Sequence, residues 1–93
     1  MTKIKKIMDC SAAWCGPCKA LSTTFDKISK MEQFSGIEFE KVDIDSDYGA
    51  EIVEKYKVRS IPTIIAVDEE GNELKKIFGN VQENSILEAL ESI

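Results

Sequence analysis

The stretch Ala-Trp-Cys-Gly-Pro-Cys-Lys at residues 13–19 decides how the rest of this chain is interpreted. Cys15 and Cys18 are separated by two residues and can form a disulfide if the backbone turns sharply between them. Gly16 and Pro17 favour that turn, and proline suits the first turn of a helix because its missing N–H would have no partner there. Cys15 would then lie at a helix N-terminus, where unpaired N–H groups and the helix dipole favour a thiolate, the form that attacks disulfides. The motif therefore predicts a redox-active dithiol.

Two other uses of this cysteine spacing are weaker. A structural zinc site needs four Cys or His ligands, whereas the chain has no histidine and only one further cysteine, Cys10. A purely structural disulfide would close a very short loop and would constrain the unfolded chain little. We therefore expect redox chemistry without a bound metal or prosthetic group.

The segments on either side of the motif have the patterns of a strand, a helix and a second strand. Lys3–Cys10 is a short β-like run that leads directly into the motif. After Pro17, apolar residues recur every three or four positions, as in a helix with one buried face. These residues are Cys18, Leu21, Phe25, Ile28 and Met31. Gly36 is a natural stop beyond this helix, and Ile37–Ile44 is predicted as the second strand.

The next predicted element is a helix over 48–56, which Ser46 or Asp47 can cap. A strand over 63–67, a hairpin turn over 68–72 and a strand over 73–78 follow. The last element is a helix over 83–92, whose buried residues are expected to be Ile86, Leu87, Leu90 and Ile93. The order is β-α-β-α-β-β-α. A strand-helix-strand start implies a right-handed crossover with parallel pairing, and the late hairpin must be antiparallel. We expect an α/β fold with a mixed four-stranded sheet and helices on both faces.

Length and composition exclude several classes of protein. Ninety-three residues are expected to form one domain, 1–93, with an ordinary content of 43% hydrophobic and 31% charged residues. The net charge of −5 and the lack of a basic cluster argue against nucleic-acid binding. No stretch has the length of a membrane span, and Met1–Met8 lacks the apolar centre of a signal peptide. Three cysteines in such a chain predict a reducing compartment, the cytoplasm by default.

Two motifs together resemble the thioredoxin family: residues 14–19 and the later run Arg59–Thr63. The Gly-Pro pair between the cysteines is closer to thioredoxin than to glutaredoxin or to oxidising disulfide isomerases. The resemblance runs from about Lys3 to the C-terminus and implies a minimal thioredoxin fold, because the strand and helix with which thioredoxins usually begin have no room here. Two residues also depart from the family pattern, since Ser11 replaces a common tryptophan and Thr23 replaces a proline that usually kinks the first helix.

The residues themselves assign different roles to the two cysteines. Cys15 is the candidate nucleophile because it is expected to be exposed at the helix start. Cys18 lies one turn later on the apolar face, so it is expected to be shielded and to resolve the mixed disulfide. Asp9 interrupts an apolar run, where burial would raise the pKa of its carboxyl group and suit it to accept a proton from Cys18. From the residues alone, a solvent-facing aspartate at the strand end is an equal alternative.

The resemblance adds further assignments. Asp9 matches an aspartate that is buried beneath the disulfide in the family, and Lys41 matches a lysine near that aspartate, although a solvated surface lysine remains an equal interpretation. The resemblance also implies that Pro62 follows a cis peptide bond and packs against the disulfide. An apolar surface for docking protein substrates is implied as well, with a core position as the alternative for the tryptophan. It would comprise Trp14, Gly16, Pro17, Ile61, Pro62 and the turn at Phe78 and Gly79.

The predicted function is a small monomeric protein-disulfide reductase whose catalytic residues are Cys15, Cys18, Asp9 and Lys41. The resemblance implies that an NADPH-dependent flavoprotein of the thioredoxin-reductase type recharges it. Two alternatives stay open: a glutathione-dependent enzyme of the glutaredoxin type, suggested by the short length, and a binding module with incidental redox activity. Cys10 has no redox counterpart in the family and is expected to be a buried, inert thiol.

Overall fold

A computed structural model describes residues 3–93, so the first two residues of the predicted domain lie outside the described part of the chain. The elements along the chain are β1 (Lys6–Ser11), α1 (Gly16–Ser29), a short 3₁₀ helix η1 (Glu32–Phe34), β2 (Glu38–Asp43), α2 (Asp47–Tyr56), β3 (Thr63–Val67), β4 (Glu73–Phe78) and α3 (Glu83–Glu91). Apart from η1, this is the predicted order β-α-β-α-β-β-α.

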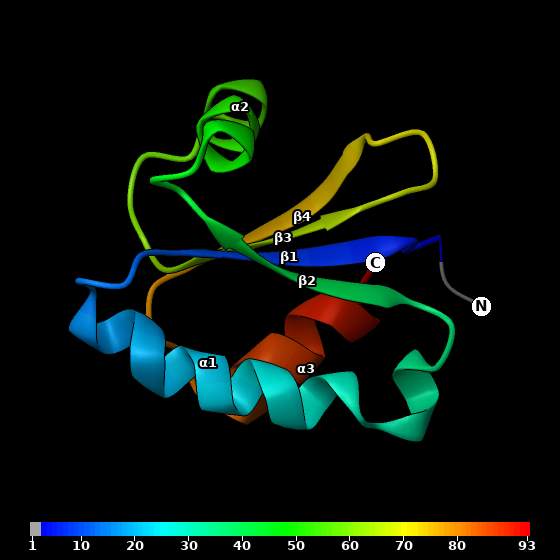
Figure 1. The fold of residues 1–93 in the computed structure, drawn as a ribbon. Coiled ribbons are helices and arrows are strands. Elements are labelled where there is room, and N and C mark those ends of the chain that lie inside the picture. The colour runs from blue at the N-terminus through cyan, green and yellow to red at the C-terminus, as the bar shows by residue number, and fades with distance from the viewer. Residues whose placement is uncertain (1–2) are drawn as a thin grey trace.

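The four strands form one mixed sheet in the order β2-β1-β3-β4. β1 and β2 pair in parallel, and the β1–β3 and β3–β4 pairs are antiparallel. Figure 1 shows α1 and α3 side by side on one face of the sheet and α2 alone on the other. The predicted α/β architecture, with a mixed four-stranded sheet and helices on both faces, is confirmed.

Helix α1 buries the apolar face that its sequence pattern predicts. Its buried residues are Cys18, Leu21, Phe25 and Ile28. The helix ends at Ser29, two residues before Met31. The short helix η1 then carries the chain to Gly36, whose φ of 90° is a conformation that glycine adopts without steric cost. Met31 still packs against the core, but from the connection rather than from the helix.

Several boundaries and two positions expected to be buried differ from the predictions. β1 begins at Lys6 rather than Lys3, and β2 is shorter by a residue at each end. At the C-terminus Ile86 and Leu90 are buried, whereas Leu87 is only partly buried and Ile93 is exposed. The prediction for Ile93 was wrong because α3 ends at Glu91, so the helical spacing that would place Ile93 beneath Leu90 does not extend that far.

The strand residues alternate between two cores. In β1, Ile7 faces α1 and α3, whereas Met8 and Cys10 belong to the core beneath α2. Asp9 therefore faces α1, on the same side as Ile7. On β2, Phe39 also faces α1, where its ring lies 5.3 Å from that of Phe25.

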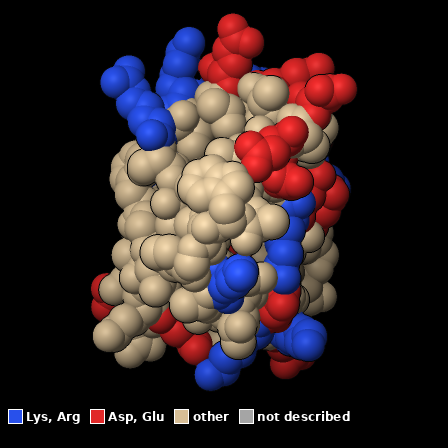
Figure 2. All heavy atoms as spheres, turned by 60° about the vertical axis from the view of Figure 1, so that its left-hand side comes forward, with Lys and Arg blue, Asp and Glu red and all other residues tan. Residues whose placement is uncertain are grey.

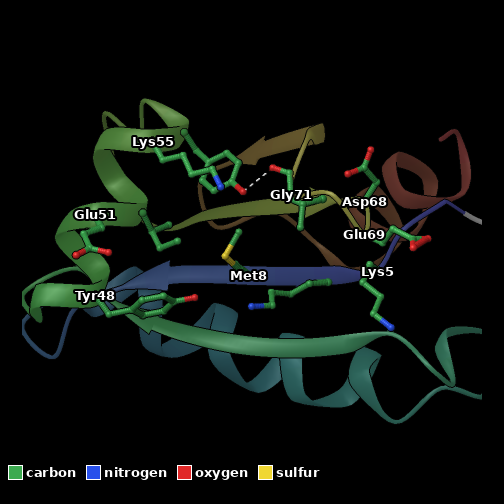
Figure 3. Close-up of a pocket in the computed structure, with 12 residues that line it drawn as sticks. Lys5, Met8, Tyr48, Glu51, Lys55, Asp68, Glu69 and Gly71 are labelled. Carbon is green, nitrogen blue, oxygen red and sulfur yellow. Dashed lines mark hydrogen bonds between the residues drawn. The ribbon is translucent and has the colours of Figure 1, made fainter.

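One hollow, of about 390 Å³, lies between α2 and the turn that joins β3 to β4, above β1 (Figure 3). Met8 lies at its centre, and Tyr48 and Lys55 approach it from α2. The Tyr56 hydroxyl donates a hydrogen bond to the Gly71 carbonyl at 2.7 Å, which ties α2 to that turn. Neither Cys15 nor Cys18 lines this hollow. Within residues 3–93, no helix combines the length and apolar character needed to cross a membrane.

Gly49 allows α2 to approach the end of β2. The Ser46 hydroxyl caps this helix, as predicted, by accepting a hydrogen bond from the Gly49 N–H at 2.9 Å. A methyl group at position 49 would collide with the backbone of Asp43 and would lie 2.8 Å from the Cα of Ile44.

We predict that Gly49→Ala lowers the free energy of unfolding of the oxidised protein by about 2 kcal/mol, because the backbone must shift to accept the methyl group. Urea unfolding followed by circular dichroism measures the change. Gly16→Ala is the matched control, since a methyl group there meets no atom within 4 Å and the gain in helix propensity is similar. Equal stability of the two variants would contradict the proposed close approach.

Candidate active site

Cys15 and Cys18 form a disulfide at the start of α1, with their Cα atoms 5.3 Å apart. Cys15 is the N-cap residue of this helix, and Pro17 lies in its first turn. The Cys18 N–H points at the Cys15 sulfur from 3.3 Å. A backbone donor in this position stabilises negative charge on the sulfur, as does the positive end of the helix dipole. The predicted pairing and the place of Cys15 at the helix N-terminus are confirmed.

Cys15 is less open than the sequence suggested. It is 6% exposed, compared with 2% for Cys18. The expectation of an exposed nucleophile was wrong because both cysteines form a small cluster with Ala12, against which Ile44 and Ile61 pack. Cys15 remains the more accessible of the two, and Cys18 is shielded on the buried face of α1, as predicted.

Asp9 is completely buried, and neither of its carboxylate oxygens has a hydrogen-bond partner. Burial raises the pKa of this carboxyl group from its ordinary value of 3.8 to about 6, while the charge of Lys41 pulls it down and that of Asp26 pushes it up. The alternative of a solvent-facing aspartate is excluded. An uncompensated carboxyl at this depth is costly to ionise, so it can exchange a proton near neutral pH.

Lys41 lies beside Asp9 but bonds elsewhere. The two residues stand opposite each other in the backbone register of the parallel β1–β2 pair. The Lys41 ammonium instead contacts both carboxylate oxygens of Asp26 on α1, at 2.9 and 3.0 Å. Lys41 is about half exposed, so it is neither a freely solvated lysine nor a direct partner of Asp9.

The segment before β3 has the cis peptide bond that the family resemblance implies, between Ile61 and Pro62. The Gly79 N–H donates a hydrogen bond to the Pro62 carbonyl at 2.9 Å, which brings the turn after β4 to this segment. The Thr63 hydroxyl donates to the Ser60 carbonyl at 2.7 Å. These bonds hold the segment in place near the disulfide, where Ile61 packs against the cysteine cluster.

Trp14 lies on the surface, with 69% of its area exposed, so the alternative of a core aromatic is wrong. Its indole N–H donates a hydrogen bond to the Asp45 carboxylate at 2.9 Å. Trp14 and Ile61 line one side of a hollow of about 310 Å³ that Val58 and Arg59 also border. Figure 2 shows uncharged residues over the left and centre of this end of the molecule, with a basic side chain in the lower centre and further charged side chains on the right and at the top and bottom.

The rest of the expected docking surface is more dispersed. Gly16 and Pro17 are exposed at the start of α1, and Phe78 is exposed at the end of β4. Gly79 is partly buried beside Pro62. Of these positions, Gly79 is joined to Pro62 by the backbone hydrogen bond, and the exposed residues lie at the ends of two different elements, α1 and β4.

Cys10 is fully buried beneath α2, and burial raises the pKa of its thiol to about 11. A thiol in this environment stays protonated and unreactive, which agrees with the prediction of an inert residue. Within residues 3–93, no group of three or more His, Cys, Asp or Glu side chains is placed to hold a metal ion.

Two residues near the site were not identified from the sequence: Asp45, which accepts the bond from Trp14, and Asp26, which binds Lys41. Asp45 lies in a polar loop, and Asp26 lies on the polar side of an amphipathic helix. Both positions look like ordinary solvated carboxylates. Their partners are 31 and 15 residues away, so no local pattern points to either contact.

Comparison with known proteins identifies one family. The thioredoxin family model matches residues 2–92. A thioredoxin of Aspergillus fumigatus is 37% identical over 73 residues, 78% of this chain, and one of Mycoplasma genitalium is 39% identical over 82 residues, 88% of this chain. The chain spans 64% of the Aspergillus protein and 76% of the Mycoplasma protein. The crystal structure of Malassezia sympodialis thioredoxin superposes with a TM-score of 0.81 at 27% identity, covering 97% of this chain and 74% of that one.

The raised pKa of Asp9 predicts how stability depends on pH. Folding raises the pKa from 3.8 to about 6, so the folded state binds the proton more tightly than the unfolded state does. The free energy of unfolding of the oxidised protein should therefore fall as the pH rises from below 3.8 to above about 6, by ~3 kcal/mol in total from this group. Asp9→Asn should remove this part of the pH dependence of the free energy of unfolding, which urea unfolding across this pH range measures. Glu88→Gln, an exposed change, should keep it; a slope unaffected by Asp9→Asn would contradict the assignment.

Proposed function

Because the chain belongs to the thioredoxin family, we propose that it is a thiol-disulfide oxidoreductase that reduces disulfides in other proteins. The observation that supports this most directly is the Cys15–Cys18 disulfide at the N-terminus of α1. We propose that residues 1–93 act as one domain in this reaction. The family comparisons do not favour the glutaredoxin-type enzyme or the binding module.

The proposed reaction begins with the reduced dithiol. The Cys15 thiolate attacks a sulfur of the substrate disulfide, forms a mixed disulfide, and releases the other substrate sulfur as a thiolate. Cys18 then attacks Cys15, which breaks the mixed disulfide, releases the second substrate thiol and closes Cys15–Cys18. Two electrons pass from the dithiol to the substrate.

Asp9 would assist the second step. Cys18 must lose a proton before it attacks, and a buried carboxylate whose pKa is near 6 can accept that proton at neutral pH. Lys41 would modulate Asp9 through its charge, which favours the ionised carboxylate. In the next reduction the proton would return from Asp9 to the Cys18 thiolate.

Substrates would dock on the uncharged surface around the disulfide. Trp14 offers a large exposed ring, and Ile61, partly buried in the segment just before β3, would offer its backbone to an extended substrate beside the buried Pro62. Gly16, Pro17 and Gly79 lack bulky side chains and would let a polypeptide approach closely. A broad surface of this kind suits many protein disulfides rather than one small molecule.

An NADPH-dependent flavoprotein of the thioredoxin-reductase type would return electrons to the oxidised pair. We place the protein in the cytoplasm as a monomer. A free thiol at Cys10 is compatible with a reducing compartment, and a net charge of −5 opposes self-association.

The reaction can be tested by insulin-disulfide reduction with dithiothreitol as the electron source. Cys15→Ser should abolish catalysis because no nucleophile remains, and Cys18→Ser should stop at a mixed disulfide on Cys15 that non-reducing electrophoresis detects. Cys10→Ala is the control and should keep wild-type turnover. Full turnover by either active-site variant would defeat the mechanism.

The electron donor can be tested separately. The oxidised protein should be reduced much faster by NADPH with a thioredoxin reductase than by glutathione. The loss of NADPH absorbance measures the rate of the reductase reaction. Faster reduction by glutathione would instead support the glutaredoxin-type alternative.

A further inference from the structure

The ion pair between Asp26 and Lys41 lies on the surface, yet its lysine is next to the buried Asp9 in the sheet. Lys41 and Asp9 are aligned across β1 and β2. Residues aligned in a parallel pair project to the same face of the sheet, and Phe39, two positions before Lys41, contacts Phe25 of α1. Lys41 is therefore the cation nearest in the sheet to the buried carboxyl of Asp9.

Lys41 nevertheless leaves Asp9 without a hydrogen bond. Both Asp9 oxygens are unpartnered, while both Asp26 oxygens contact the Lys41 ammonium. The side chains of Lys41 and Asp26 are each about half exposed, so packing does not hold either in place. Such exposed pairs are weak, and a modest change can redirect a lysine with four rotatable bonds.

We propose that Asp26 is a positioning residue: its carboxylate holds the Lys41 ammonium at the outer edge of the seam between α1 and β2, and so keeps Asp9 free of a direct cationic partner. The inference deepens the proposed function, because Asp9 is there the proton acceptor for Cys18. The charge of Asp26 also raises the pKa of Asp9 directly, and the inference concerns the larger effect that Asp26 has by holding Lys41.

A hollow of about 280 Å³ gives the Lys41 side chain open space, although neither Asp9 nor Asp26 lines it. Cys18 and Lys41 both line it, together with Ser22 of α1 and Asp43 at the end of β2. The hollow opens to solvent, so the lysine chain has space to take another position if Asp26 releases it. It also brings solvent to the side of the site where the resolving cysteine lies.

The charged and titratable groups on the elements around Asp9 determine which of them can shift its pKa. On β1 its neighbour is the Cys10 thiol, which stays protonated, and β3 has no charged residue. From α3, Glu83 is paired with Lys27 of α1 at 3.0 Å. Lys41 from β2 and Asp26 from α1 are the charged groups that shift the pKa of Asp9, the first downward and the second upward. Loss of Asp26 should therefore lower it, most of all if Lys41 then turns to Asp9.

The test is a titration of the Asp9 carboxyl carbon by ¹³C NMR in the oxidised protein. The variants are Asp26→Asn, Asp26→Glu, Lys41→Met and the double variant Asp26→Asn/Lys41→Met. Glu83→Gln is the matched control, because it breaks another ion pair that involves α1, the one between Glu83 of α3 and Lys27, and leaves Lys41 in place.

We expect Asp26→Asn to move the Asp9 midpoint down by about one pH unit and Asp26→Glu to restore it, with no change in Glu83→Gln. In the Lys41→Met background, Asp26→Asn should shift the midpoint by less than half as much. An unshifted midpoint in Asp26→Asn, or an equal shift in both backgrounds, would overturn the inference, since the second result means that Asp26 acts directly by its own charge.

A second measurement separates this inference from the proposed function. The acid limb of the pH profile for insulin reduction should move with the Asp9 midpoint in Asp26→Asn. If the titration shifts as expected and the activity profile does not, Asp26 positions Lys41 as proposed, but Asp9 is not the proton acceptor in the reaction.

Discussion

The packing of α1 against the sheet is the constraint on which the rest of the molecule depends. The helix is anchored by one buried face, with Leu21 and Phe25 at its centre, and that anchoring fixes where its first turn lies. Cys15 caps this turn and receives the Cys18 N–H on its sulfur. If the helix rotated by one residue against the sheet, Cys18 would leave the buried face and the disulfide would lose its position beside Ile61. The hydrophobic contacts of the helix thus determine the chemistry at its end.

The same packing creates an electrostatic cost at Asp9. The carboxyl group lies on the face of the sheet that α1 covers, in a position where its strand otherwise contributes apolar side chains. A core selected for stability alone would have an aliphatic residue there. The protein keeps instead a group that destabilises its own ionised form. Such strained polar groups are typical of sites where a proton must be taken up and released near neutral pH.

The local elements were readable from the sequence because each has a strong periodic or turn signal. β3 and β4 have the predicted bounds, and the helical spacing of Leu21, Phe25 and Ile28 correctly identified the buried face of α1. The wrong predictions fall at the ends of elements, where the apolar spacing continues in the sequence but the helix or strand stops. Ile93 keeps the helical spacing of Leu90, yet the helix ends before reaching it.

The amino-acid order was sufficient to identify the dithiol, the helix that follows it and the succession of helices and strands along the chain, because these depend on residues close together in the chain. The tertiary structure alone decided how covered Cys15 is, where Trp14 lies, and that Lys41 binds Asp26 rather than Asp9. These outcomes depend on which surfaces meet when β1, β2 and α1 pack together. The partner of a charged side chain depends on the distance between the charges and on their solvent exposure, and both are set only when the chain folds.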